Sequence, residues 1–403
     1  MNISDKSALR ECTSCQMCAA VCPKNAIQID LDKSGFFRPW VNLDQCIDCG
    51  LCINVCYRFD DNLKITDEKN LQRTDLYAAS VRDSSLLMRV TSGGASDLFA
   101  KELIHEGYLC IGVGYDDTRV EAYHYVAHTA KETDGFRGSK YIQSYSYPAF
   151  KELVKDCSKH KYAVFGTPCQ IYAVRRFLEK RKQSDSCILI DMFCHGCPSL
   201  NLWRKYQNEI KGEMRESHFD AVEFRSKERG WGEYHVAMIV DGCKAFISSP
   251  KKDGFYELFF SDQVLNAACS DCLLRSTMEY TDIRLGDFWG KKYAMNRKGV
   301  SAVSLISQKG KDLFEKIKPL LDIEESRYSE LLPYQSYGKI YHPDEALREK
   351  LLYMVTDPGI PLKEAVTLLQ SNESFTRKFK RHIKDFLYYL PASVTRFIRR
   401  YIA

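Results

Sequence analysis

Residues 12–23 read CTSCQMCAAVCP, and residues 46–57 read CIDCGLCINVCY. Each stretch spaces its four cysteines as C-x2-C-x2-C-x3-C, where x is any residue. With this spacing, three neighbouring thiolates hold three corners of an iron–sulfur cube, and the fourth cysteine of each stretch binds the cube of the other stretch. The pattern therefore predicts two clusters, one on Cys12, Cys15, Cys18 and Cys56, and one on Cys46, Cys49, Cys52 and Cys22.

The spacing is typical of bacterial ferredoxins with two 4Fe-4S clusters. We therefore expect residues 1–62 to form an α+β ferredoxin-like domain, with the two stretches in a βαβ-like arrangement and a turn at Gly35. A zinc site would need fewer cysteines, and a disulfide framework would need an oxidising compartment. The second stretch departs from the pattern at Tyr57, where the proline that follows Cys22 is missing. Because proline ligates nothing, the ligand assignment is unchanged.

The chain has 403 residues, of which 17 are cysteines, and a net charge of +5. Its start lacks the apolar segment of a signal peptide, and no stretch is apolar enough for a membrane span, so we expect a cytoplasmic protein. Residues 377–403 contain eight Lys or Arg and one Asp, which gives +7 and leaves −2 for the other residues. A body with so little charge does not predict a nucleic-acid-binding protein.

Residues 75–330 have the pattern of a mixed α/β domain. Short apolar runs predict buried strands at 108–113, 162–166 and 187–193. Helices are expected between them, at 95–106 and 171–182.

Residues 331–403 predict a helical region that ends in a basic amphipathic tail. Two interpretations of this tail are open. It contacts an anionic membrane surface peripherally, or it is a helix docked on the body with its basic face in water.

Five further cysteines fall in short motifs at the expected ends of strands: Cys169, Cys194, Cys197, Cys269 and Cys272. In α/β sheets, sites are built from the loops at the carboxyl ends of the strands. Four thiolates from three such loops can hold a third cluster. From the spacing alone, the alternative that these are small buried side chains is also open.

Several motifs resemble the coenzyme F420 hydrogenase/dehydrogenase beta-subunit family, over about residues 1–330. In chain order they are TSGG at 91–94, GSKYIQS at 138–144, GTPCQ at 166–170, FCHG at 193–196, the pair Cys269 and Cys272, and DIRLGDFWG at 282–290. Members of this family are iron–sulfur flavoproteins that bind FAD beside a 4Fe-4S cluster. The resemblance implies a third cluster on Cys169, Cys194, Cys269 and Cys272, with Cys197 as a neighbour. Buried thiols are expected at Cys110, Cys157, Cys187 and Cys243.

A flavin site has to be sought in small loops, because no G-x-G-x-x-G motif is present. Backbone N–H groups at a helix N-terminus bind phosphate, and glycine allows close approach. The candidates for binding the flavin are Ser92, Gly93, Gly94, Gly138, Ser139, Lys140, Gly166, Thr167 and Asp287. Each glycine pair alone is explained as well by a turn or a cap, and only their joint match to the family implies flavin binding. His195 and Lys140 are the catalytic candidates, with a structural role as the alternative for His195.

These features together predict an oxidoreductase that passes electrons between 4Fe-4S clusters and FAD, to reduce or oxidise an organic substrate or a deazaflavin-type cofactor. The expected electron partner is a ferredoxin, a deazaflavin or NAD(P)H. The alternative is a non-catalytic electron-transfer subunit of a larger redox complex. An iron–sulfur sensor ranks last, because no DNA-binding motif is present.

Overall fold

The computed structural model describes residues 2–5, 12–249 and 253–373, and beyond them only the single residues 378, 383 and 394. The predicted basic tail therefore lies almost wholly outside the described residues. Within the described part of the chain, no helix is long and apolar enough to cross a membrane.

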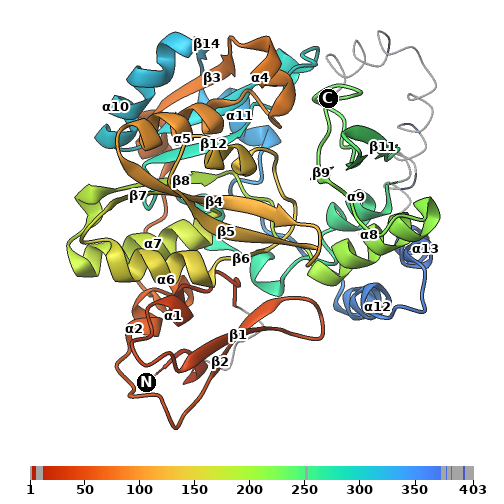
Figure 1. Cartoon of the computed structure of the whole chain (residues 1–403), viewed down its shortest axis with the longest axis horizontal. Helices are drawn as coiled ribbons and strands as arrows, with labels where there is room; N and C mark the ends of the chain where they lie inside the picture. Colours follow the sequence, from red (N-terminus) through yellow and green to blue (C-terminus); the bar gives the residue numbers. More distant parts are fainter. Residues whose placement is uncertain are drawn as a thin grey trace.

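The N-terminal unit is built from two short helices and one β-hairpin, at the bottom of Figure 1. Its elements are α1 (Met17–Ala20), β1 (Ile27–Leu31), β2 (Phe37–Val41) and α2 (Leu51–Asn54). The predicted βαβ-like arrangement is wrong, because β1 pairs with β2 antiparallel. Five residues join the two strands, too few for the crossover that parallel strands need. The predicted turn at Gly35 is present, and its φ of +81° favours glycine.

A nine-stranded mixed sheet forms the body, in the order β14-β3-β13-β12-β8-β7-β4-β5-β6. Its strands are β3 (Asp75–Val81), β4 (Tyr108–Asp116), β5 (Glu121–Ala127), β6 (Ser144–Tyr145), β7 (Lys161–Phe165), β8 (Cys187–Met192), β12 (Ile283–Asp287), β13 (Ser301–Leu305) and β14 (Leu321–Glu325). Strands β12, β8, β7 and β4 are parallel neighbours. Their carboxyl ends therefore meet at one edge of the sheet, which we call the carboxyl edge.

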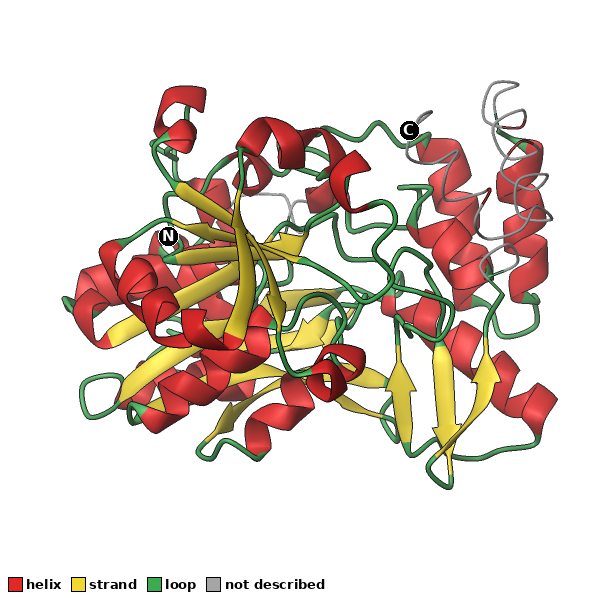
Figure 2. Ribbon diagram, turned by 90° about the horizontal axis from the view of Figure 1, so that it is seen from above, coloured by secondary structure: helices red, strands yellow, loops and turns green. Residues whose placement is uncertain are grey.

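Helices cover both faces of this sheet, as Figures 1 and 2 show. One face carries α4 (Ser84–Arg89), α5 (Ala95–His105) and α10 (Gln308–Ile317), and the other carries α6 (Tyr147–Asp156) and α7 (Pro168–Arg181). Along the central strands β7 and β8, Ala163 and Ile188 pack on the first face, and Val164 and Leu189 pack on the second. Burial on both sides explains why these strands are continuous apolar runs.

A second core lies beside the sheet, on the right of Figure 1. It combines the three-stranded sheet β9 (Ala221–Glu223), β10 (Ala237–Val240) and β11 (Cys243–Ile247) with α8 (Leu200–Met214), α9 (Gly254–Phe259), α12 (Glu345–Thr356) and α13 (Leu362–Ser371). Two short α-helices, α3 (Glu68–Gln72) and α11 (Tyr328–Leu331), and several 3-10 helices complete the described chain. The expected burial of Cys243 is wrong, because this thiol is exposed on the edge strand β11.

The mixed α/β architecture expected for the body is confirmed, as are its predicted strands and helices. The three predicted strands correspond to β4, β7 and β8, and the two predicted helices to α5 and α7. Helix α7 starts three residues earlier than expected, at Pro168. Proline suits the first turn of a helix, and Thr167 and Gln170 form a capping box there.

Candidate functional site

Two cavities in the N-terminal unit are each lined by four cysteines. The first is lined by Cys12, Cys15, Cys18 and Cys56, which we call the middle thiol group. The second is lined by Cys22, Cys46, Cys49 and Cys52, which we call the outer thiol group. Each cavity thus combines three cysteines of one stretch with the last cysteine of the other, which is the crossed arrangement that the spacing predicts.

Left-handed backbone positions turn each stretch around its cavity. Gln16 has a φ of +64° and Gly50 a φ of +74°, and each precedes the short helix that carries a buried cysteine. Backbone N–H groups also point at sulfur: that of Ser14 lies 3.4 Å from Cys12 Sγ, and that of Ala26 lies 3.3 Å from Cys22 Sγ. Such N–H donors stabilise a thiolate.

Burial raises the pKa of Cys15 to about 12 and that of Cys56 to about 11. Without a positive partner these thiols therefore keep their protons, and a bound metal is what removes them. Within the described residues, no three His, Cys, Asp or Glu side chains are grouped so as to hold a single metal ion. Four thiols around one cavity suit a larger group whose metal atoms each take one thiolate, so the donor set fits a 4Fe-4S cluster.

Five more thiols meet at the carboxyl edge, and we call them the inner thiol group. They interact electrostatically with one another: Cys169, Cys194, Cys197, Cys269 and Cys272. They come from three segments: the start of α7 after β7, the loop after β8, and the stretch between α9 and β12. An isolated bridge between Pro198 and Leu265 joins the last two segments.

Local contacts favour the thiolate form in the inner group. Cys169 lies in the first turn of α7, where the helix dipole favours negative charge, and its Sγ is 3.2 Å from the Thr167 hydroxyl oxygen. Burial raises the pKa of Cys269 to about 11, although the nearby positive charge of Arg275 opposes this shift. The five thiols of the group are thus half-buried, and they have hydrogen-bond donors and a cation beside them.

Cys197 belongs to the inner group more closely than the expectation of a mere neighbour implies. It lies close enough to all four predicted ligands to interact with them electrostatically. The carbonyl of Cys197 accepts the Asn266 N–H at 2.8 Å. Five thiols are thus available for four positions, and which four bind stays a prediction.

The three thiol groups follow one another from the surface to the sheet. Cys49 of the outer group is exposed. Cys15 of the middle group and Cys169 of the inner group pack against the same apolar cluster. The ring of Tyr57, which follows Cys56, packs in the same apolar cluster that contacts Cys15, Cys169 and Cys272. The middle group therefore lies between the other two.

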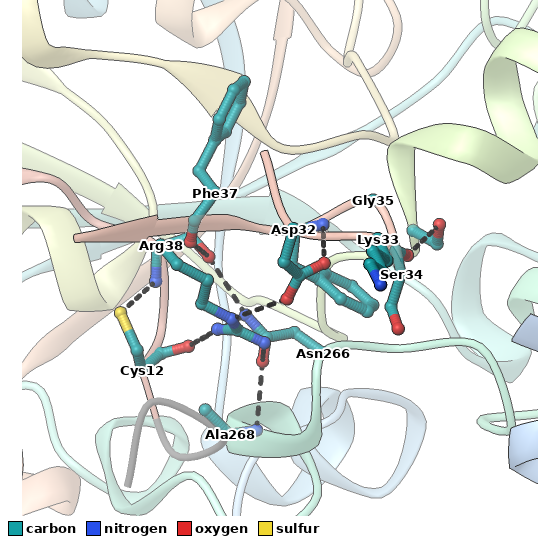
Figure 3. A network of polar contacts seen from close by, with 12 residues as sticks. Cys12, Asp32, Lys33, Ser34, Gly35, Phe37, Arg38, Asn266 and Ala268 are labelled. Atoms are coloured by element: carbon teal, nitrogen blue, oxygen red, sulfur yellow. Dashed lines mark hydrogen bonds and ion pairs between the residues drawn. The ribbon is translucent and has the colours of Figure 1, made fainter. Parts of the chain in front are cut away.

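A polar network around Arg38 and Asn266 fixes the middle group against the inner group (Figure 3). The guanidinium of Arg38 donates to the Cys12 carbonyl at 2.5 Å and to Asp32 at 3.0 Å. The side-chain amide of Asn266 donates to the same carbonyl at 3.0 Å, and its main-chain carbonyl accepts the Cys269 N–H at 2.8 Å. One residue thus contacts loops of both groups.

The predicted loop of Ser92, Gly93 and Gly94 lies over the sheet beside the carboxyl edge. A Cβ on Gly93 would stand 2.0 Å from the Ala79 carbonyl oxygen, so close packing on β3 explains this glycine. Gly94, with a φ of +90°, is the N-cap residue directly before α5. The Ser92 carbonyl accepts from the ammonium of Lys227 at 2.7 Å.

The second predicted loop, at 138–140, lies against the first. The Ser139 N–H donates to the Thr91 hydroxyl at 2.8 Å, and the space beside Gly138 is open. The ammonium of Lys140 donates to the carbonyls of Val113, Gly135 and Arg137, each at 2.8 Å. These bonds tie the loop to β4, and a catalytic role for Lys140 stays a prediction.

Asp287, at the end of β12, is held by residues that sequence reasoning did not single out. Arg225 pairs with its carboxylate at 2.6 and 2.9 Å, and the Trp231 indole N–H donates to it at 2.8 Å. Burial raises the pKa of Asp287, but these contacts outweigh burial, and the pKa lies below its usual range. The rings of Trp231 and Trp289 stack at 4.4 Å. No motif marks Arg225; its neighbour in space, Asp287, was the available signal.

The other predicted residues also lie at the carboxyl edge. Gly166 and Thr167 follow β7 and lead directly to Cys169. His195 follows Cys194, and its Nε2 lies 2.9 Å from an Asp262 carboxylate oxygen, while Nδ1 lies 3.0 Å from the Tyr341 hydroxyl. The imidazole is therefore oriented from both sides. This geometry suits a proton donor, and it is equally typical of a structural histidine.

Comparison with known proteins identifies two parts of the chain. Residues 11–58 match the family model of the 4Fe-4S dicluster domain, and residues 159–330 match the family model for the C terminus of the coenzyme F420 hydrogenase/dehydrogenase beta subunit. The predicted 4Fe-4S domain and the family resemblance are thereby confirmed. The family is named for hydrogenases and dehydrogenases, which are oxidoreductases.

Two curated relatives match short stretches. The coenzyme F420 hydrogenase subunit beta of Methanococcus voltae is 32% identical over 72 residues, 17% of this chain and 26% of that protein. The ferredoxin-type protein NapF of Haemophilus influenzae is 43% identical over 42 residues, 10% of this chain and 24% of that protein. The chain thus spans about a quarter of the length of each relative. A chain in the solved F420-reducing [NiFe] hydrogenase complex of Methanosarcina barkeri is 17% identical, with a TM-score of 0.47, over 76% of this chain and 94% of that chain.

Proposed function

We propose that this chain, whose residues 159–330 belong to the coenzyme F420 hydrogenase/dehydrogenase beta-subunit family, is an iron–sulfur flavoprotein oxidoreductase. It exchanges electrons between a redox partner and an organic substrate or a deazaflavin-type cofactor. The observation that supports this function most strongly is the succession of three thiol groups, from an exposed cysteine to the carboxyl edge of the sheet.

We assign one 4Fe-4S cluster to each thiol group, and FAD to the loops beside the inner group. The cluster ligands are Cys12, Cys15, Cys18 and Cys56 in the middle group, Cys22, Cys46, Cys49 and Cys52 in the outer group, and Cys169, Cys194, Cys269 and Cys272 in the inner group. When bound, clusters supply one-electron transfer, and a flavin supplies two-electron exchange with an organic molecule.

The chain's own part is to hold the thiol groups in a fixed order and to limit the access of water to them. Cys18 of the middle group and Cys52 of the outer group are buried, and Met17 and Val55, their neighbours in the chain, pack in one apolar cluster with α6 and α7. At the other end, the exposed Cys49 leaves the outer group within reach of a partner.

Several features support a flavin diphosphate beside α5. The first N–H groups of α5 have no acceptor within the helix, and the helix dipole favours an anion there. The loop with Gly138 and Ser139 lies next to this helix start, and the space beside Gly138 is open. Asp287, held by Arg225, is the candidate contact to the flavin from β12.

A second candidate function is that of an electron-transfer subunit without a substrate of its own. It is favoured by four large apolar side chains that are exposed near the outer thiol group: Trp40, Leu43, Ile47 and Leu51. Apolar side chains gathered on a surface mark a site for another protein. A partner that co-purifies at a fixed ratio, and without which the chain has no activity, would favour this function.

The test is the content of iron, sulfide and flavin per chain, after purification without oxygen. We expect about 12 iron atoms, which is three 4Fe-4S clusters, and about one FAD. About 8 iron atoms and no flavin would refute both the inner cluster and the flavoprotein.

Single substitutions make the same test specific for the inner group. Cys194→Ser should lower the iron content from about 12 to about 8 atoms, since one cluster is lost. Cys157→Ser is the matched control, because Cys157 is buried outside the three groups. Cys197→Ser should leave the iron content unchanged; if it removes one cluster and Cys194→Ser does not, the ligand assignment is wrong.

A further inference from the structure

Tyr57 occupies the position that proline has in the first cysteine stretch. Both residues directly follow the last cysteine of their stretch, Pro23 after Cys22 and Tyr57 after Cys56. Tyr57 starts a 3-10 helix, Tyr57–Phe59, and only 5% of its surface is exposed. The second stretch therefore places a large, buried, polar side chain where the first has a small one.

The ring of Tyr57 is fixed by packing between the N-terminal unit and α7. It lies in one apolar cluster with Val55 and Ile171. Its ring centroid is 6.1 Å from that of Tyr172 on α7, at an edge-to-face angle of 76°, and the Arg58 guanidinium lies 5.0 Å from it on a ring face. The orientation of the side chain is thus determined on several sides.

The hydroxyl of Tyr57 is buried and has no hydrogen-bond partner among the described residues. A buried hydroxyl without a partner destabilises a protein, so such groups are rare and call for an explanation. The same apolar cluster is in contact with Cys15, Cys169 and Cys272. The cysteines with which Tyr57 interacts electrostatically include Cys272 and Cys169 of the inner group.

We propose that the Tyr57 hydroxyl donates a hydrogen bond to a sulfur atom of the cluster held by the inner thiol group. A donor at sulfur stabilises the more negative, reduced form of a cluster, so this bond raises its reduction potential. The inference rests on the proposed function, since it needs the inner cluster to be present. Tyr57 acts as a positioning and tuning residue, which touches the cluster but takes no part in a covalent step.

The test is Tyr57→Phe in the full chain, purified without oxygen, with every cluster potential measured by redox titration monitored by electron paramagnetic resonance. We expect a full iron content and a lower potential for one cluster. Loss of one hydrogen bond should change the reduction equilibrium about tenfold, which is about 59 mV for one electron. The cluster that shifts should be the one removed by Cys194→Ser.

Tyr162→Phe is the matched control. Its hydroxyl is also buried without a partner among the described residues, but it lies on β7 beside Cys157 and Cys187, outside the three groups. This variant should leave all potentials unchanged. Unchanged potentials in Tyr57→Phe, or a shift confined to the middle cluster, would overturn the inference.

Failure of the proposed function has a different signature. In that case the parent protein itself contains about 8 iron atoms, whatever residue stands at position 57. If Tyr57→Phe is poorly folded, the iron–sulfur stretching bands of the parent protein in H2O and D2O decide the question. A shift on deuteration of an inner-cluster band supports the hydrogen bond, and its absence contradicts it.

Discussion

Removal of the Asn266 side chain should weaken the contact between the segments that carry the middle and inner thiol groups. This side chain is only 1% exposed and makes four hydrogen bonds. Its carbonyl accepts from Arg38 at 3.3 Å and from the Ala268 N–H at 3.2 Å, and its amide donates to the Cys12 carbonyl at 3.0 Å and to the Ser14 hydroxyl at 3.2 Å. Asn266→Ala removes all four.

The size of the effect follows from these contacts. Four buried hydrogen bonds contribute about 1 kcal/mol each to stability, or about 4 kcal/mol together. The Cys12 carbonyl keeps its bond from Arg38, and the Ser14 hydroxyl keeps its bond to the Phe37 carbonyl. Some of the partner groups therefore keep a hydrogen bond after the substitution. We expect a loss of about 2–4 kcal/mol in the free energy of unfolding.

The assay is the rate at which the protein releases iron to a chelator without oxygen, together with unfolding in urea. A loss of 1.4 kcal/mol corresponds to a factor of about ten, so release by Asn266→Ala should be at least about tenfold faster. Asn201→Ala is the control. The Asn201 amide joins α8 to the N-terminal unit by a bond to the Lys33 carbonyl at 3.1 Å, and to α12 by a bond to the Thr356 hydroxyl at 2.9 Å, and neither involves a cysteine. Equal release rates in both variants would refute the reasoning.

Three other substitutions have defined outcomes. Arg225→Met leaves the Asp287 carboxylate without its ion-pair partner and should destabilise the protein by about 3–5 kcal/mol in urea unfolding; adding Asp287→Asn should recover part of this, and no recovery would contradict the pairing. Burial lowers the pKa of His124 to about 4 from about 6.5, so the neutral ring stabilises the fold above pH 6.5 and this stability is lost as the pH falls toward 4. His124→Phe should remove about 3 kcal/mol of the pH dependence of the free energy of unfolding. If the free energy of unfolding depends on pH as it does in the parent protein, His124 is excluded as the source. Trp40→Asp, at a side chain that is 57% exposed, should slow reduction by a protein donor about fivefold or more and leave reduction by dithionite unchanged; equal slowing of both would point to damage at the outer cluster.

The middle and outer thiol groups could be predicted from the sequence because their geometry is local. Three of the four cysteines in each group lie within one short stretch, so their spacing alone brings them together. The βαβ-like arrangement failed for a related reason: cysteine spacing carries no information on how the strands between the stretches pair. That pairing is set by the short turn at Gly35.

The inner group depends on long-range topology. Cys169, Cys194 and Cys269 meet because β12 is inserted beside β8, although about ninety residues separate these strands in the chain. Spacing alone left the alternative of buried thiols open, and only the family motifs favoured a site. No motif marked Asn266 or Arg225, and the only signal for Arg225 was its partner Asp287. Tyr57 did carry one, as the residue where the second stretch departs from the ferredoxin pattern.

The hydrogen bonds between the N-terminal unit and α6 have a consequence for the rate of turnover. Gln16 accepts the N–H groups of Ser146 and Tyr147 at the start of α6, and the Lys151 ammonium donates to the Cys22 carbonyl at 2.9 Å. A ferredoxin on a flexible tether would swing between donor and acceptor, and its turnover would slow in viscous solvent. Here no such domain movement is needed, because these contacts fix the distances between the thiol groups. If the proposed function holds, solvent viscosity should therefore affect only the encounter with an outside partner, and not the transfer of electrons within the molecule.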